Sequence, residues 1–267
     1  MEILETYDKD SDILVNGKNV FKTMEIYLQK FPERYRYCYY RNLETLELFR
    51  IDSFLNSYKY GMYCLIENEL FFSNKKAIGH ELMHMASSDR IMRQFAFESN
   101  LNIEGGLVEG MTEYHHMMAY DLKKPGAYSF EVFTTMMLDD IPNVFESFFI
   151  PRERGIYDIC PNKELVYHLL CALSLYTELT IGCVSPHGEK KSFADLLEIG
   201  RDIRQTFDSL IDIKLSLCNN PVELKNYADK FMDLVKSDFM KNIGEYYFPN
   251  YQKYAEAIID RKIRKRG

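Results

Sequence analysis

The sequence predicts an α+β fold, in which a small N-terminal mixed sheet and one histidine-bearing helix precede a mainly helical C-terminal half. Two hairpin signals in the first 73 residues predict the sheet: Asn16-Gly17 between apolar residues, and an apolar, aromatic-rich stretch at 61–73. From about Lys76 onward the apolar residues recur mainly with helical spacing.

The first hairpin signal is strong because Asn16 and Gly17 both tolerate the positive φ that a tight turn requires. A helix is predicted after it, from about Thr23 to Gln29, ending near Pro32. Residues 34–40 are dense in tyrosine, which favours a strand. Residues 43–58 fit neither the helical nor the strand period.

The second signal predicts two short strands within 61–73, joined by a turn near Glu67-Asn68. The apolar spacing then predicts a series of helices, near 76–87, 90–99, 106–121, 129–138, 162–180, 191–216 and 221–240. Asn220 and Pro221 suit the cap and first position of the last helix. We expect two subdomains: an α+β part over 1–105 and a helical part over 106–267.

The charge balance argues against a nucleic-acid partner. The 267 residues have a net charge of -7 and a pI of about 5.5, without a dominant basic stripe. The one dense basic run, at 261–266, is interpreted as a solvated helix end or a frayed tail. No apolar run reaches 18 residues, so no membrane contact is predicted.

The cysteines and the N-terminus suggest a cytoplasmic protein. The six cysteines are scattered without a C-x-x-C pair, so free thiols are expected rather than disulfides or a cysteine zinc site; they are Cys38, Cys64, Cys160, Cys171, Cys183 and Cys218. The acidic N-terminus lacks a classical secretory signal, although export by another route would leave no mark here.

Residues 78–85 contain the pattern H-E-x-x-H, formed by His80, Glu81 and His84. On a helix, positions four apart lie on one face, so both imidazoles can reach one metal ion. Glu81 follows the first ligand by about 100° around the helix, where it can act as general base on a metal-activated water. The alternative is that both histidines are ordinary residues of a helical core.

A second helix supplies carboxylates at matching spacing. Glu109 is the predicted third metal ligand, since catalytic zinc sites usually have three protein ligands. Glu113, four residues later, is expected to accept the free ring N–H of a ligating histidine. Glu104 is the alternative third ligand. His116 is expected to line the cleft.

The set of His80, Glu81, His84 and Glu109 resembles the gluzincin metallopeptidases, over roughly residues 70–120. Val108 departs from the asparagine usual in their N-E-G-x-x-E motif, and the 24 residues between His84 and Glu109 exceed the spacing of the best-known members. The resemblance implies a zincin-like fold, one Zn²⁺ per chain and hydrolysis of a peptide or protein substrate. An endopeptidase is favoured, and an aminopeptidase stays open.

Two further features follow from that resemblance. An edge strand before the active-site helix would hold the substrate, either 70–73 or its partner 62–66. A donor from the C-terminal half would stabilise the oxyanion, for which the sequence offers four unranked side chains: Tyr128, Tyr157, His168 and His187. His115 is expected to be structural.

Two other functions remain open from sequence. Glu81/His84 and Glu113/His116 form two E-x-x-H pairs, as in di-iron carboxylate bundles, although that interpretation gives His80 no role. A catalytically inactive zincin-like binding module is the second alternative. The sequence leaves the oligomeric state, the substrate and the pathway undetermined.

Overall fold

The computed structural model describes residues 2–54, 60–87, 105–139, 141, 144–150, 160–181 and 192–264. They fall in two compact units. The first unit takes its described residues from Met1–Asn100, Thr112–Lys124 and Phe145–Arg152, and the second from Leu101–Met111, Pro125–Val144 and Glu153–Gly267. The sequence-based division at residues 105 and 106 stays a prediction.

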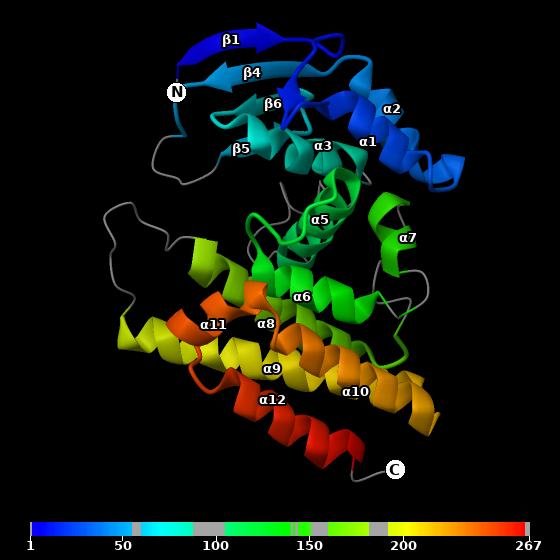
Figure 1. The fold of residues 1–267 in the computed structure, drawn as a ribbon, viewed down its shortest axis with the longest axis vertical. Coiled ribbons are helices and arrows are strands. Elements are labelled where there is room, and N and C mark those ends of the chain that lie inside the picture. The colour runs from blue at the N-terminus through cyan, green and yellow to red at the C-terminus, as the bar shows by residue number, and fades with distance from the viewer. Residues whose placement is uncertain are drawn as a thin grey trace. The chain divides into compact units, whose positions relative to one another are not determined.

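The first unit contains the small mixed sheet that the sequence predicted (Figure 1). Its strand order is β1 (Ile3–Tyr7), β4 (Glu47–Ile51), β6 (Glu69–Phe72), β5 (Gly61–Cys64), and only β4 and β6 run parallel. Because β6 lies between β4 and β5, the stretch 70–73 is not an edge strand. The alternative stretch, 62–66, overlaps β5, which lies at one edge of the sheet.

Both predicted hairpins are present. Asn16 and Gly17 have φ of 51° and 76° and connect β2 (Leu14–Val15) to β3 (Lys18–Asn19). Asn68, with φ of 56°, ends the turn between β5 and β6. The positive φ values of Asn16 and Gly17 confirm the reason for which the first turn was predicted.

The strand predicted over 34–40 is wrong. The chain forms a 3-10 turn at Glu33–Tyr35 and helix α2 at Tyr37–Leu43. Cys38, Tyr39 and Asn42 are buried, a spacing of one helical face, so the tyrosines there belong to an amphipathic helix. Aromatic strand preference mostly reflects packing on a half-buried surface, and here that surface is helical.

Helices complete the first unit. Helix α1 (Val20–Leu28) begins where the Asn19 side chain accepts from the backbone N–H of Lys22. Helix α3 (Ile78–Ala86) contains the H-E-x-x-H pattern. It packs against β5 and β6 and contacts α1 and α2 (Figure 1). Helix α3 therefore covers the β5–β6 end of the sheet.

The second unit is helical, as predicted. Its helices are α6 (Ser129–Leu138), α8 (Lys163–Ile181), α9 (Phe193–Leu217), α10 (Pro221–Val235), α11 (Lys241–Tyr246) and α12 (Tyr251–Ile259). Four aromatic rings form its core: Phe130, Phe133, Phe207 and Phe231. The predicted helix at 90–99 lies outside the described residues.

Part of the basic run near the C-terminus is paired within the second unit. Lys262 Nζ lies 2.6 Å from Asp208 Oδ1 and 2.8 Å from Asp212 Oδ2, both on α9. Arg264 pairs with Asp260 one helical turn away. The acids of α9 thus partly neutralise this helix end.

Helix α5 (Gly105–Tyr120) contributes residues to both units, with the division between Met111 and Thr112. In the second unit its glycines permit close helix packing. A Cβ on Gly110 would lie 2.5 Å from the backbone oxygen of Glu131 on α6. One on Gly106 would lie 2.7 Å from Thr177 Oγ1 on α8. Side chains at these two positions would separate the helices.

The sequence also predicted free cysteines and no transmembrane helix. Five cysteines are free thiols in the described ranges, and Cys183 lies outside them. Among the helices described here, none combines the length and apolarity needed to cross a bilayer.

Candidate metal centre

Helix α3 holds the histidine pair in a buried setting. All nine of its residues are buried, and Leu82 and Met83 are fully enclosed, as expected for a helix packed on both sides. His80 and His84 lie one turn apart, and their Nε2 atoms are 3.2 Å apart. Two nitrogens bound to one tetrahedral zinc at about 2.0–2.1 Å would be about 3.3 Å apart, so this spacing fits a shared ion.

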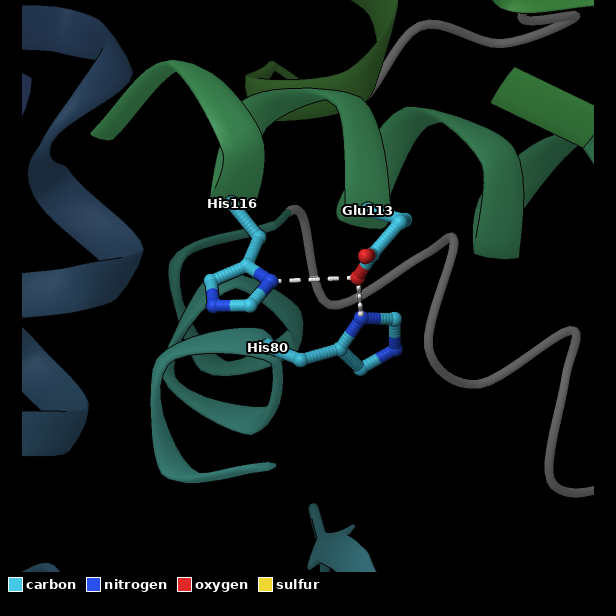
Figure 2. Close-up of side chains that lie close together, drawn as sticks. All are labelled: His80, Glu113 and His116. Atoms are coloured by element: carbon cyan, nitrogen blue, oxygen red, sulfur yellow. Dashed lines mark hydrogen bonds and ion pairs between the residues drawn. The ribbon is translucent and has the colours of Figure 1, made fainter. Parts of the chain in front are cut away.

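Glu113, on α5, lies between the rings of His80 and His116 (Figure 2). Its Oε2 accepts from Nδ1 of His80 at 2.7 Å and from Nδ1 of His116 at 3.1 Å. Because an ionised carboxylate can only accept, both histidines carry their proton on Nδ1. His80 therefore directs the electron pair of its Nε2 toward His84.

The ionisation of Glu113 supports this arrangement. Burial by itself would raise the pKa of this carboxyl group. The hydrogen bonds from His116 and His80 outweigh burial and hold the pKa well below its ordinary value. Glu113 is thus an anion that orients one histidine of α3, the arrangement expected around metal-binding histidines.

His84 has its own partner on α5, which sequence reasoning missed. Its Nδ1 lies 3.3 Å from Oγ1 of Thr112, a fully buried residue next to Glu113. The one signal in the sequence was a polar residue directly before Glu113 on the same helix. Which ring a hydroxyl meets depends on tertiary packing, so spacing alone did not identify it.

Glu109 lies one turn before Glu113 on α5 and is buried. A carboxylate oxygen of Glu109 and one ring nitrogen each of His80 and His84 all lie within 4.8 Å of one another. These are the three residues that the sequence predicted as metal ligands, and their role as ligands stays a prediction. Glu104, the alternative third ligand, lies outside the described residues.

A second buried carboxyl group lies on α6, close enough to Glu109 for their charges to interact. Burial raises the pKa of Glu131 to about 7, although its Oε1 accepts from the Thr177 hydroxyl at 2.7 Å. The negative charge of Glu109 contributes to this rise in the pKa of Glu131. Near neutral pH, Glu131 is therefore partly protonated, which limits repulsion between the two acids.

His80, Glu113 and His116 form another group whose atoms are near enough for a metal ion. The 2.7 Å between His80 Nδ1 and Glu113 Oε2 is a hydrogen-bond distance, shorter than two ligands of one tetrahedral ion require. The ring of His116 also packs against Gly79: a Cβ on Gly79 would lie only 2.9 Å from His116 Nε2. The distances therefore fit Glu113 and His116 as hydrogen-bonding partners around His80 better than as ligands of one ion.

Glu81 is held by the edge strand. The backbone N–H of Tyr63, on β5, donates to Glu81 Oε2 at 3.0 Å. At Gly61, two residues earlier, a Cβ would lie only 2.7 Å from Glu81 Cγ. Strand β5 therefore both leaves room for this side chain and fixes one of its oxygens. Neither contact was expected from the sequence.

The remaining histidines and tyrosines have other surroundings. His115 is buried among aromatic rings and its Nδ1 lies 2.7 Å from the Tyr27 hydroxyl. Tyr128 and His168 lie in the second unit, while Tyr157 and His187 are outside the described residues. The oxyanion donor stays a prediction.

Comparison with protein-family models, with curated proteins and with solved structures finds no match. Buried histidines and a carboxylate at these distances can hold a metal ion, and their nitrogen and oxygen donors suit zinc among other divalent metals.

Proposed function

We propose that this chain is a zinc-dependent metallopeptidase of the gluzincin type with a zincin-like fold. His80, His84 and Glu109 would hold one Zn²⁺, and Glu81 would be the general base. The main support is the convergence of the two Nε2 atoms, 3.2 Å apart, with His80 oriented by Glu113. A buried cation relieves the repulsion that three electron-pair donors would otherwise exert on one another.

Each residue has a distinct task in this proposal. Zinc, when bound, supplies the acidity that makes a water nucleophilic near neutral pH and polarises the substrate carbonyl. Glu81 takes the proton of the attacking water and then passes it to the leaving amine, which converts one carboxylate into base and acid in turn. Glu113 keeps His80 in the Nδ1–H form, so its Nε2 stays available as a ligand.

The geometry favours one zinc ion over a di-iron centre. A di-iron site needs Glu81 and His84 as ligands of one iron and Glu113 and His116 of the other. In the described ranges, Glu81 belongs to neither group of nearby donor atoms, and its carboxylate accepts from the Tyr63 amide. His80, which the di-iron set omits, belongs to both groups.

The test pairs metal content with turnover. Wild type, Glu109→Ala and Glu81→Gln would be analysed for bound metal and then assayed with a library of quenched fluorescent peptides. We expect about one zinc per chain in wild type and in Glu81→Gln, and much less in Glu109→Ala. Only wild type should cleave peptides. Glu81→Gln keeps the shape of the base but cannot take up the proton, and Glu109→Ala lacks the metal.

Other outcomes have definite meanings. Full activity of Glu81→Gln would refute its role as general base. Two irons per chain would replace this proposal with the di-iron centre. Zinc without cleavage of any peptide would leave a metal-binding module, and unchanged zinc in Glu109→Ala would move the third ligand elsewhere.

A further inference from the structure

Asn68 lies in the turn that joins β5 to β6, and its side chain connects that turn to two other segments. Its Oδ1 accepts from the hydroxyl of Tyr63 at 2.8 Å. Its Nδ2 donates to the backbone oxygen of Asn42 at 2.7 Å and to Oγ1 of Thr45 at 2.9 Å. The backbone φ of Asn68 is 56°, a conformation that glycine, asparagine and aspartate adopt most readily. Of these three, only asparagine offers both an acceptor and two donors.

Asn42, near the end of α2, extends these contacts to helix α3. Its Nδ2 donates to the backbone oxygen of Met85 at 3.3 Å, in the last turn of α3. Carbonyl groups in the last turn of a helix have no partner within the helix, so the buried side chain of Asn42 satisfies one of them. The β5–β6 turn is therefore connected to the helix that bears Glu81.

Strand β5 is thus connected to α3 through its backbone and also through a side chain. The backbone N–H of Tyr63 donates to Oε2 of Glu81 at 3.0 Å. The hydroxyl of the same buried tyrosine is connected to the end of α3 through Asn68 and Asn42. A shift of β5 relative to α3 would therefore have to lengthen both sets of hydrogen bonds.

We propose that Asn68 is a positioning residue for Glu81. By holding the side chain of Tyr63, it keeps the Tyr63 N–H at the place where this group meets the carboxylate. The inference rests on the proposed function, in which Glu81 is the general base and has to be held close to its working position. The proposed metal ligands take no part in these contacts, so loss of Asn68 should change turnover and leave zinc affinity unchanged.

The Tyr63 amide can be observed by itself. Met62-Tyr63 is the only Met-Tyr pair in the sequence, so labelling with ¹³C-carbonyl methionine and ¹⁵N-tyrosine gives a single amide signal in nuclear magnetic resonance. A charged acceptor makes a stronger bond to an N–H than a neutral one, so Glu81→Gln should shift this signal. The size of that shift reports how well the amide meets the Glu81 side chain, and it requires neither substrate nor metal.

The test replaces Asn68 with glycine and with aspartate, both of which permit the positive φ. Glycine removes the side-chain hydrogen bonds, and aspartate keeps only the acceptor. We expect the shift caused by Glu81→Gln to be lost in Asn68→Gly and reduced in Asn68→Asp. Asn16→Gly is the matched control and should retain the full shift, because Asn16 has a φ of 51° in the turn between β2 and β3.

Kinetics on the best library peptide give a second readout. Asn68→Gly should lower kcat about 10-fold and leave KM unchanged, because the orientation of the base is lost and substrate binding is not. Zinc affinity, measured by competition with a chromophoric chelator, should equal that of wild type. Asn16→Gly should match wild type in both measurements.

The outcomes separate this role from the proposed function. A full Glu81→Gln shift in Asn68→Gly would overturn the proposal, and so would a normal kcat or equal effects of Asn68→Gly and Asn16→Gly. If wild type cleaves no peptide, the proposed function fails, and the amide signal still decides whether Asn68 positions the Glu81 side chain.

Discussion

Glu113 meets two histidines at once, which gives this single carboxylate more influence on the site than its neighbours. It orients His80 from one side and is itself held by His116 from the other (Figure 2). Both bonds lie in a buried environment, where loss of a charge-assisted hydrogen bond is costly.

The first prediction concerns this residue. Glu113→Gln should weaken zinc binding about 10- to 100-fold, because a neutral amide holds His80 in its ligand form less firmly. Competition with a chelator measures the change. His116→Gln is the matched control one step further away and should have a smaller effect. An unchanged affinity for Glu113→Gln would show that Glu113 does not support the ligand.

The second prediction concerns His115. Burial lowers its pKa to about 3, so the folded protein cannot take up this proton until the solution is strongly acidic. The unfolded chain protonates near pH 6.5, so stability is intact above that value and decreases as pH falls from 6.5 toward 3. Between pH 7 and pH 5 the loss from this group is about 2 kcal/mol.

His115→Phe should remove that loss, as measured by urea unfolding at pH 7 and pH 5. Tyr27→Phe is the control: it removes the hydroxyl next to His115 but keeps the ring buried, so the acid sensitivity should remain. Equal pH dependence of wild type and His115→Phe would contradict the buried neutral state.

At the residue scale, helix geometry was enough to pair His80 with His84 and Glu109 with Glu113, because residues four apart share a helical face. Their roles at a metal site stay predictions. Thr112 and the Tyr63 amide were not found, since each contact joins two elements whose packing no local period encodes.

At the scale of the elements, strand β5 packs directly against helix α3. The strand approaches the helix so closely at Gly61 that only a hydrogen fits beside Glu81. The third prediction follows: Gly61→Ala should displace Glu81 and lower kcat about 100-fold, since misplacement of a catalytic group by about 1 Å can cost that much. Zinc affinity should not change, because Glu81 is not in the proposed ligand set.

Gly200→Ala in α9 is the control, because a Cβ there meets only the Arg204 side chain at 3.7 Å. Steady-state kinetics on the best library peptide and zinc titration together check the prediction. A Gly61→Ala protein with normal kcat would show that the contact does not position the base.

Elements with strong chemical signals were predicted well, and those defined by packing were not. The Asn16-Gly17 turn and the helices of the second unit follow from turn chemistry and a sustained helical period. Strand β4 lies in the stretch that fitted no period. The error at 34–40 arose because tyrosine suits a buried helix face as well as a strand.

At the scale of the whole molecule, α5 belongs to two units and also supplies Glu109. The chain enters the first unit as three separate segments. Local sequence patterns predict elements but not which distant segments share a compact unit, so this organisation was beyond sequence reasoning.

The fourth prediction concerns metal and global stability. A ligand that binds only the folded state stabilises it by about 2.7 kcal/mol at a concentration 100 times its Kd. For a chain of this size, that corresponds to a rise in Tm of about 5–10 °C on adding zinc to chelator-treated protein. Calorimetry checks it. His84→Gln should show little rise, and an equal rise would indicate that zinc acts at another place.

The close glycine contacts have a consequence for genetics. Gly61, Gly79 and Gly110 each leave less than 3 Å for a Cβ, against atoms of Glu81, of His116 and Tyr120, and of Glu131 and Thr135. A random-mutagenesis selection against activity should therefore recover alanine and serine at these three codons alongside changes at the histidines. The positions at which such a selection tolerates no substitution would therefore include these glycines, although a glycine has no reactive side chain.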